Sequence, residues 1–154
     1  MIPGVVRLHV GEHVDERGTL YKPMSSSFAH IRECFYSWSK QHVLRGMHWQ
    51  PYQSRIVVCI SGHVVDVLLD MRKDSPTYGL HQAMDLHNAG AVYIPSGVAH
   101  GFYACESSLI LYLSTAVYSP DEEKGIRWDS FGYDWPHAGL IISDRDRKLP
   151  CMPS

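Results

Sequence analysis

The strongest constraint on the fold is that short, β-branched apolar runs alternate with turn signals that arrive roughly every 8–12 residues. No stretch of about ten residues carries an apolar stripe at helical spacing, so we expect any helices to be short and near the C-terminus. The turn at Ser61–Gly62 predicts a hairpin between the two runs that flank it. The expected strands are Arg55–Ile60, Val64–Asp70, Leu80–Leu86, Ala91–Ile94 and, as the longest candidate, Ser107–Tyr118.

The central strands are predicted to be covered on both faces. The stretch from Arg55 to Leu69 is apolar on both faces instead of at alternate positions, which is typical of strands buried on both sides. A sandwich or barrel with a solvent-filled opening, as a monomer or a dimer, satisfies this pattern. We expect one all-β domain over residues 1–154, in which the segment after Ser119–Pro120 forms a short helical or irregular appendage.

Charge and cysteine content exclude several classes of protein. The net charge is −2 and the basic residues are scattered, so the sequence has no basic stripe for nucleic acid and no polybasic membrane patch. The four cysteines show no C-x-x-C spacing, and Cys59 is expected to be a buried free thiol. Neither a secretory leader nor an apolar stretch of membrane-spanning length is evident. A cytoplasmic location with reduced thiols is the expectation.

Two histidines stand beside glycine in strand-like sequence, His48 in Arg45–Gln50 and His100 in Pro95–Phe102. A small β-barrel presents such imidazoles to one interior cavity. Imidazole is the side chain best suited to proton transfer near neutral pH. The pair therefore indicates a proton-transfer enzyme.

The residues around these histidines add polar groups to the same expected cavity. Strict alternation places Arg45 and His48 on opposite faces, but a bulge at Gly46 allows both to reach one cavity. Arg55 opens an apolar strand and requires a partner or a place at the cavity rim. Asp66, inside another apolar run, is expected to pair with Arg55 or Arg45.

Taken together, these residues resemble the dTDP-4-dehydrorhamnose 3,5-epimerase family. The matching motifs follow one another in order along most of the chain: Asp15–Gly18, Val43–Gln50, Gly62–Val67, Asp70–Gly79, Ile94–Phe102, Tyr112 with Tyr118–Pro120, Trp135–Pro136, Ser143–Asp146 and Pro150. The resemblance implies a cupin-type double-stranded β-helix that dimerises, needs no metal or other cofactor, and acts on a nucleotide-linked 4-keto sugar. The implied reaction removes a proton next to a ketone and returns one on the opposite face.

The resemblance also implies roles for individual residues. His48 matches the general base, Asp146 the carboxylate that orients it, and Tyr112 the acid on the other face. Arg55 stands where the family typically has a lysine that stabilises the enolate, and a guanidinium also pairs with an oxyanion. The positions that match substrate contacts are Arg17, Arg45, His100, Tyr118, Glu123 and Arg145.

Three departures from the family concern the nucleotide base. Lys22 stands where a glutamate is common, and Glu33 and Phe35 replace a Gln-x-Asn pair. Because recognition by hydrogen bonds is demanding about its partners, a base other than thymine becomes an open alternative.

Other functions remain open at the level of sequence. C3, C5 or both can be inverted, and a ketoisomerase uses the same enediol chemistry. A nucleotide-sugar-binding module without activity is a further alternative. A metal-dependent cupin oxygenase is disfavoured, since the usual His-x-His with a following Glu is missing around His48.

Overall fold

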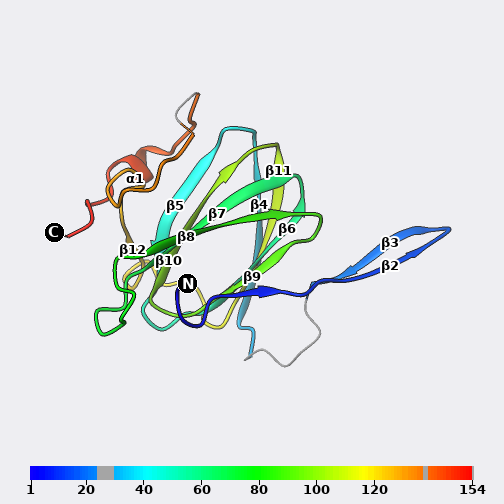
Figure 1. Cartoon of the computed structure of the whole chain (residues 1–154), viewed down its shortest axis with the longest axis horizontal. Helices are drawn as coiled ribbons and strands as arrows, with labels where there is room; N and C mark the ends of the chain where they lie inside the picture. The colour runs from blue at the N-terminus through cyan, green and yellow to red at the C-terminus, as the bar shows by residue number, and fades with distance from the viewer. Residues whose placement is uncertain (24–29, 137–138, 154) are drawn as a thin grey trace.

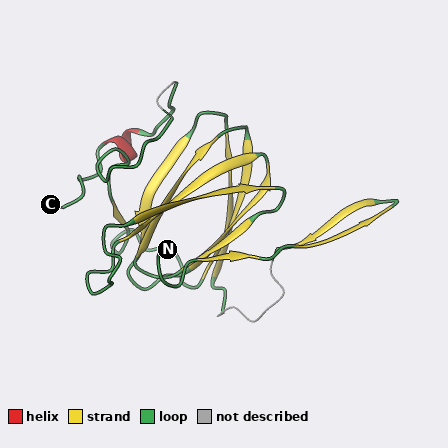
Figure 2. Cartoon of the chain, in the orientation of Figure 1, coloured by secondary structure: helices red, strands yellow, loops and turns green. Residues whose placement is uncertain are grey.

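The computed structural model describes residues 1–23, 30–136 and 139–153, and two antiparallel five-stranded sheets dominate it (Figures 1 and 2). The first sheet has the order β1-β9-β6-β11-β4, formed by β1 (Val6–Leu8), β9 (Ala91–Ile94), β6 (Arg55–Ser61), β11 (Ser108–Ser114) and β4 (Glu33–Ser39). The second has the order β12-β5-β10-β7-β8, formed by β12 (Lys124–Gly125), β5 (Leu44–Trp49), β10 (Val98–Ala104), β7 (His63–Asp70) and β8 (His81–His87). The expected cupin-type double-stranded β-helix is confirmed.

Alternation along β6 explains how the first sheet is buried on both sides. Val57 and Cys59 point between the two sheets, into a core that they share with Phe102 of β10. Ile56 and Val58 point outward, into a separate cluster with the N-terminal strand region and β9. The prediction that the central strands are covered on both faces is therefore confirmed, and so is the burial of Cys59.

The expected hairpin across Ser61–Gly62 is wrong. Strand β6 pairs with β9 and β11, whereas β7 pairs with β8 and β10 in the other sheet. A local turn signal reports a change of chain direction but not which strands pair. Because both strands are apolar on two faces, the chain can turn this corner from one sheet into the other without exposing either.

The chain after β11 covers the outer face of the second sheet. The longest expected strand, Ser107–Tyr118, ends as β11 at Ser114. Ile126, Trp135 and Ile142 pack there against β5, β7 and β10. The segment contains α1 (Asp144–Arg147), so the expected short C-terminal helix is confirmed. No helix among the described residues is long and apolar enough to cross a membrane.

A two-stranded hairpin, β2 (Gly11–Asp15) and β3 (Gly18–Lys22), projects away from both sheets (Figure 1). Its apolar side chains Val14 and Leu20 are exposed.

Candidate active site

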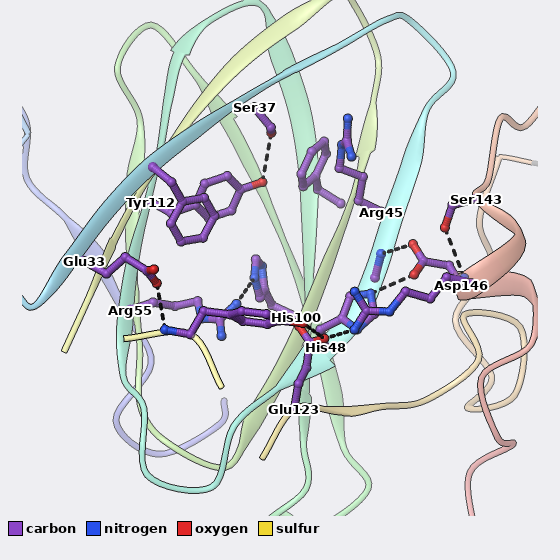
Figure 3. Close-up of a pocket in the computed structure, with 15 residues that line it drawn as sticks. Glu33, Ser37, Arg45, His48, Arg55, His100, Tyr112, Glu123, Ser143 and Asp146 are labelled. Carbon is purple, nitrogen blue, oxygen red and sulfur yellow. Dashed lines mark hydrogen bonds and ion pairs between the residues drawn. The ribbon is translucent and has the colours of Figure 1, made fainter. Parts of the chain in front are cut away.

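A cavity of about 510 Å³ opens between the two sheets, a size typical of small-molecule sites (Figure 3). All the site residues expected from the sequence line it except Arg17. They are Arg45, His48, Arg55, His100, Tyr112, Tyr118, Glu123, Arg145 and Asp146, and the remaining lining residues are Glu33, Phe35, Ser37, Gly46, Phe102 and Ser143.

Glycines bring the strands of one wall together. In the pairing of β5 with β10, His100 lies opposite His48 and Phe102 opposite Arg45, so β5 contains one extra residue at this point. This is the expected bulge, and it places both Arg45 and His48 on the cavity side. A Cβ on Gly46 would overlap the backbone of Gly101, and Gly46 has φ +126°.

His48 and Asp146 form a hydrogen-bonded pair in this wall. The imidazole Nε2 lies 2.8 Å from Asp146 Oδ1, and the Gly46 N–H donates to Oδ2 at 3.2 Å. Burial by itself raises the pKa of Asp146. The hydrogen bonds from His48 and from the Gly46 N–H outweigh burial, so this pKa lies below its usual value of 3.8.

The ionised Asp146 fixes the tautomer of His48. A carboxylate only accepts hydrogen bonds, so Nε2 carries the proton and donates it. The lone pair is then on Nδ1, which is buried and has no hydrogen-bond partner among the described residues. In the neutral imidazole, Nδ1 is thus the nitrogen that carries no proton.

Tyr112 stands on the opposite wall, in β11 of the first sheet (Figure 3). Its ring stacks on Phe35, with centroids 4.6 Å apart, and its hydroxyl lies 3.3 Å from Ser37 Oγ. Burial raises the pKa of this phenol to about 12, against the opposing effect of Ser37. Tyr112 is therefore protonated at neutral pH and able to donate.

A chain of hydrogen bonds joins Arg55, His100 and Asp66 between these two walls. Arg55 Nη1 donates to His100 Nε2 at 3.2 Å, and His100 Nδ1 lies 3.3 Å from Asp66 Oδ1. The expected pairing of Asp66 with an arginine is therefore wrong. His100 of β10 lies diagonally across from Asp66 of β7, and its Nδ1 is the group that reaches the carboxylate.

The protonation of His100 follows from this chain. A guanidinium only donates, so Nε2 of His100 must accept and its proton resides on Nδ1. Burial lowers the pKa of His100, and the charges of Arg55 and His48 lower it further against the opposing effect of Asp66. The imidazole is accordingly held neutral.

The remaining charged residues of the cavity differ in how they are paired. Glu123 forms an ion pair with Arg145 and accepts a hydrogen bond from the Tyr118 hydroxyl at 3.1 Å. Arg45 donates to Ser39 Oγ and to a backbone carbonyl, and none of the described carboxylates pairs with it. Of Arg45 and Arg145, Arg45 is therefore the cation more available to an anionic ligand.

Arg17 lies outside the cavity, at the turn of the β2–β3 hairpin, where it pairs with Asp15. Its side chain is 83% exposed.

Sequence reasoning missed Ser37 and Ser143 as lining residues. Ser143 is the N-cap of α1, where its Oγ accepts the N–H of Asp146 at 3.1 Å. The Ser-x-x-Asp spacing is a capping signature and was the available signal for this residue. Ser37 carried no such signal. Its neighbours Tyr36 and Trp38 are exposed, so the apolar pattern of the strand did not indicate which face lines the cavity.

The arrangement supports proton transfer on two sides of one substrate. His48, paired with Asp146, and the protonated phenol of Tyr112 face the cavity from different sheets, and Arg55 reaches into it from the sheet of Tyr112 (Figure 3). Within the described ranges, no group of three or more His, Cys, Asp or Glu side chains is arranged to hold a metal ion.

Comparisons with known proteins point to one enzyme family. A family model described as dTDP-4-dehydrorhamnose 3,5-epimerase matches residues 1–153. The chain is 38% identical over 129 residues to the enzyme of that name from Mycolicibacterium smegmatis, an alignment that covers 79% of this chain and 64% of that protein. The chain therefore spans less than two thirds of that relative in this alignment.

Solved structures show the same likeness. The Mycobacterium tuberculosis rmlC epimerase superimposes with a TM-score of 0.91 and 32% identity, over 97% of this chain and 84% of that one. ChmJ, a 3'-monoepimerase from Streptomyces bikiniensis solved in complex with dTDP-quinovose, has a TM-score of 0.90 and 26% identity over 97% and 84%.

Proposed function

The chain belongs to the dTDP-4-dehydrorhamnose 3,5-epimerase family, and on that premise we propose that it inverts C3, C5 or both of a nucleotide-linked 4-keto sugar in deoxysugar biosynthesis. The observation that carries this proposal is the placement of a histidine–aspartate pair and a protonated phenol on opposite walls of one cavity.

The first step is removal of the proton on the carbon next to the ketone. His48 accepts this proton, and the electrons of the broken C–H bond form an enolate whose charge resides on the ketone oxygen. Asp146 holds the Nε2–H and stabilises the resulting imidazolium. General-base help of this kind contributes about 10²–10⁴ in rate.

We assign the stabilisation of the enolate oxygen to Arg55. Its guanidinium is a permanent cation, so it stabilises the oxyanion without giving up a proton. His100 does not compete for this role, because its Nε2 already accepts from Arg55.

Reprotonation is assigned to Tyr112. Its hydroxyl proton is added to the carbon from the face opposite His48, and the enolate returns to the ketone with inverted configuration. The phenolate then regains a proton and the imidazolium loses one, both in exchange with water. No electrons are gained or lost in the cycle.

We assign binding of the nucleoside diphosphate to the charged residues of the cavity. Arg45 is the cation available for a phosphate, and Arg145, Glu123, Tyr118 and His100 are placed to contact the sugar and nucleotide. The ChmJ complex makes dTDP the first candidate nucleotide. Glu33 and Phe35, also at the cavity, are where another base would be distinguished.

We also propose that the protein is a cytoplasmic homodimer in which Arg17 contributes to the partner's cavity. Support comes from the projecting β2–β3 hairpin and from the exposed Tyr36 and Trp38 on the edge strand β4. The four cysteines are free thiols, as in a reducing compartment.

Deuterium incorporation from D₂O tests the function. A panel of dTDP-, GDP- and CDP-linked 4-keto-6-deoxy sugars is followed by NMR and mass spectrometry, with His48→Ala as the control. Incorporation at C3 or C5 with inversion, abolished in the control, supports the proposal and identifies the nucleotide. Migration of the carbonyl identifies a ketoisomerase instead, and no incorporation from any member contradicts the proposal.

A further inference from the structure

We propose that Gln53 is a positioning residue that holds the Arg55 guanidinium in place for the reaction. This inference rests on the proposed function, in which Arg55 stabilises the enolate oxygen. It concerns a residue that does not line the cavity and acts only through Arg55.

Two acceptors hold two different nitrogens of Arg55. Nη1 donates to His100 Nε2 at 3.2 Å, and Nη2 donates to Gln53 Oε1. The guanidinium is planar and rigid, so fixing both terminal nitrogens fixes the plane of the group. Its three other N–H bonds are not used by these contacts and remain for an oxyanion.

Gln53 can act as a fixed support because its own amide is anchored. Its Nε2 donates to the backbone carbonyl of Ala116 at 2.9 Å, and the residue is only 6% exposed. With Nε2 used as the donor, Oε1 must face Arg55 as the acceptor. The amide orientation is therefore set by its two partners together.

The loop that carries Gln53 is also tied to the chain after β11. The Ser54 N–H donates to Thr115 Oγ1, and the Thr115 N–H donates to the Ser54 carbonyl, both at 3.0 Å. The support for Arg55 thus comes from two segments that are far apart in sequence, instead of from a free loop tip.

The support for Arg55 matters because a long arginine side chain otherwise samples many rotamers. A displacement of about 1 Å in a group that stabilises a transition state can cost about a hundredfold in rate. The enolate exists only after proton removal, so this support acts on turnover and not on substrate binding.

Gln50 provides a matched control. It lies in the same loop region and is 2% exposed, and its Nε2 donates to the backbone carbonyl of Ser119 at 3.0 Å. Its Oε1, however, has no hydrogen-bond partner within the described part of the chain. Replacing either glutamine by methionine removes one buried donor to a backbone carbonyl, but only the change at Gln53 releases Arg55.

The experiment compares Gln53→Met with Gln50→Met in the deuterium-incorporation assay on the best dTDP-sugar substrate. We expect Gln53→Met to lower kcat about tenfold to a hundredfold with KM within about twofold, and Gln50→Met to leave both within about twofold. Thermal unfolding of both variants controls for folding. Equal losses of kcat in the two variants, or no loss at Gln53, would overturn the inference.

A second measurement does not depend on turnover. In ¹⁵N NMR of the wild-type protein, a guanidinium that is held at both terminal nitrogens gives separate, slowly exchanging Nη resonances for Arg55. These resonances should merge in Gln53→Met and remain separate in Gln50→Met. Unchanged Arg55 resonances in Gln53→Met would contradict the inference. An inactive wild-type protein would count against the proposed function alone, and the resonances would still decide whether Gln53 holds Arg55.

Discussion

Nε2 of His48 lies 2.8 Å from Oδ1 of Asp146, a contact between residues 98 positions apart that joins β5 to the C-terminal helix. Because the carboxylate accepts this hydrogen bond, it determines which nitrogen of His48 is left to act as a base.

Asp146→Asn should therefore impair proton abstraction without disturbing the fold. An amide can present its NH₂ group to His48 and stabilise the wrong tautomer, and it cannot balance the imidazolium charge. We expect kcat for deuterium incorporation to fall by about 10²–10⁴ with little change in KM. Wild-type kcat in this variant would contradict the assigned pair, and circular dichroism checks that the barrel is intact.

Tyr112→Phe should separate exchange from inversion. The ring and its stacking on Phe35 are retained, but the proton donor on the second wall is lost. Deuterium should still enter substrate of unchanged configuration through His48, while formation of the inverted sugar falls by about 10²-fold or more. NMR of the sugar ring protons distinguishes the two products. Equal loss of both signals would place Tyr112 in substrate binding instead.

Alkaline pH should destabilise the protein through Tyr112. Its pKa is about 12 in the folded protein against 10 for an unperturbed phenol, because burial disfavours the phenolate. Between these pH values the folded state binds more protons than the unfolded state, so the free energy of unfolding must fall as pH rises from 10 to 12. Each pKa unit corresponds to about 1.4 kcal/mol, giving a loss of about 3 kcal/mol from this residue.

Urea unfolding at stepped pH measures that loss. Other tyrosines and lysines titrate in the same window, so the quantity to compare is the difference between wild type and Tyr112→Phe. A difference that stays constant from pH 10 to 12 would show that the phenol is not held in its neutral form.

Arg45→Met should weaken substrate binding more than catalysis. Arg45 has no ion pair with a described carboxylate, unlike Arg145, which is already paired with Glu123. Loss of a charge-assisted contact to phosphate costs about 1.5–3 kcal/mol, or roughly tenfold to a hundredfold in KM. Isothermal titration with dTDP alone tests the same contact. A normal dTDP affinity in the variant would place the diphosphate elsewhere.

Sequence reasoning was most successful where one local irregularity determined the geometry. Regular alternation places Arg45 and His48 on opposite faces, and Gly46 between them indicated the bulge that the structure contains. Glycine identifies such a position because it accepts both the positive φ and the close approach of a neighbouring strand.

Pairing between distant segments was harder to predict from the sequence. The turn at Ser61–Gly62 indicated a hairpin, yet its two strands enter different sheets, because strand partners depend on the whole barrel. Asp66 was assigned to an arginine but pairs with His100, its diagonal neighbour across β7 and β10. Charge alone predicts that a buried carboxylate has a partner, whereas sheet register decides which partner lies within reach.

The approach of Gly46 to Gly101 has a consequence for protein engineering. The wall that carries His48 and His100 is close-packed only because both positions lack a side chain, and a Cβ on Gly101 would lie 2.7 Å from the Arg45 carbonyl oxygen. A library that diversifies this wall would spread its two strands before it reshaped the cavity. Variation aimed at new sugars or bases belongs on β4, where Glu33, Phe35 and Ser37 face the cavity from an edge strand.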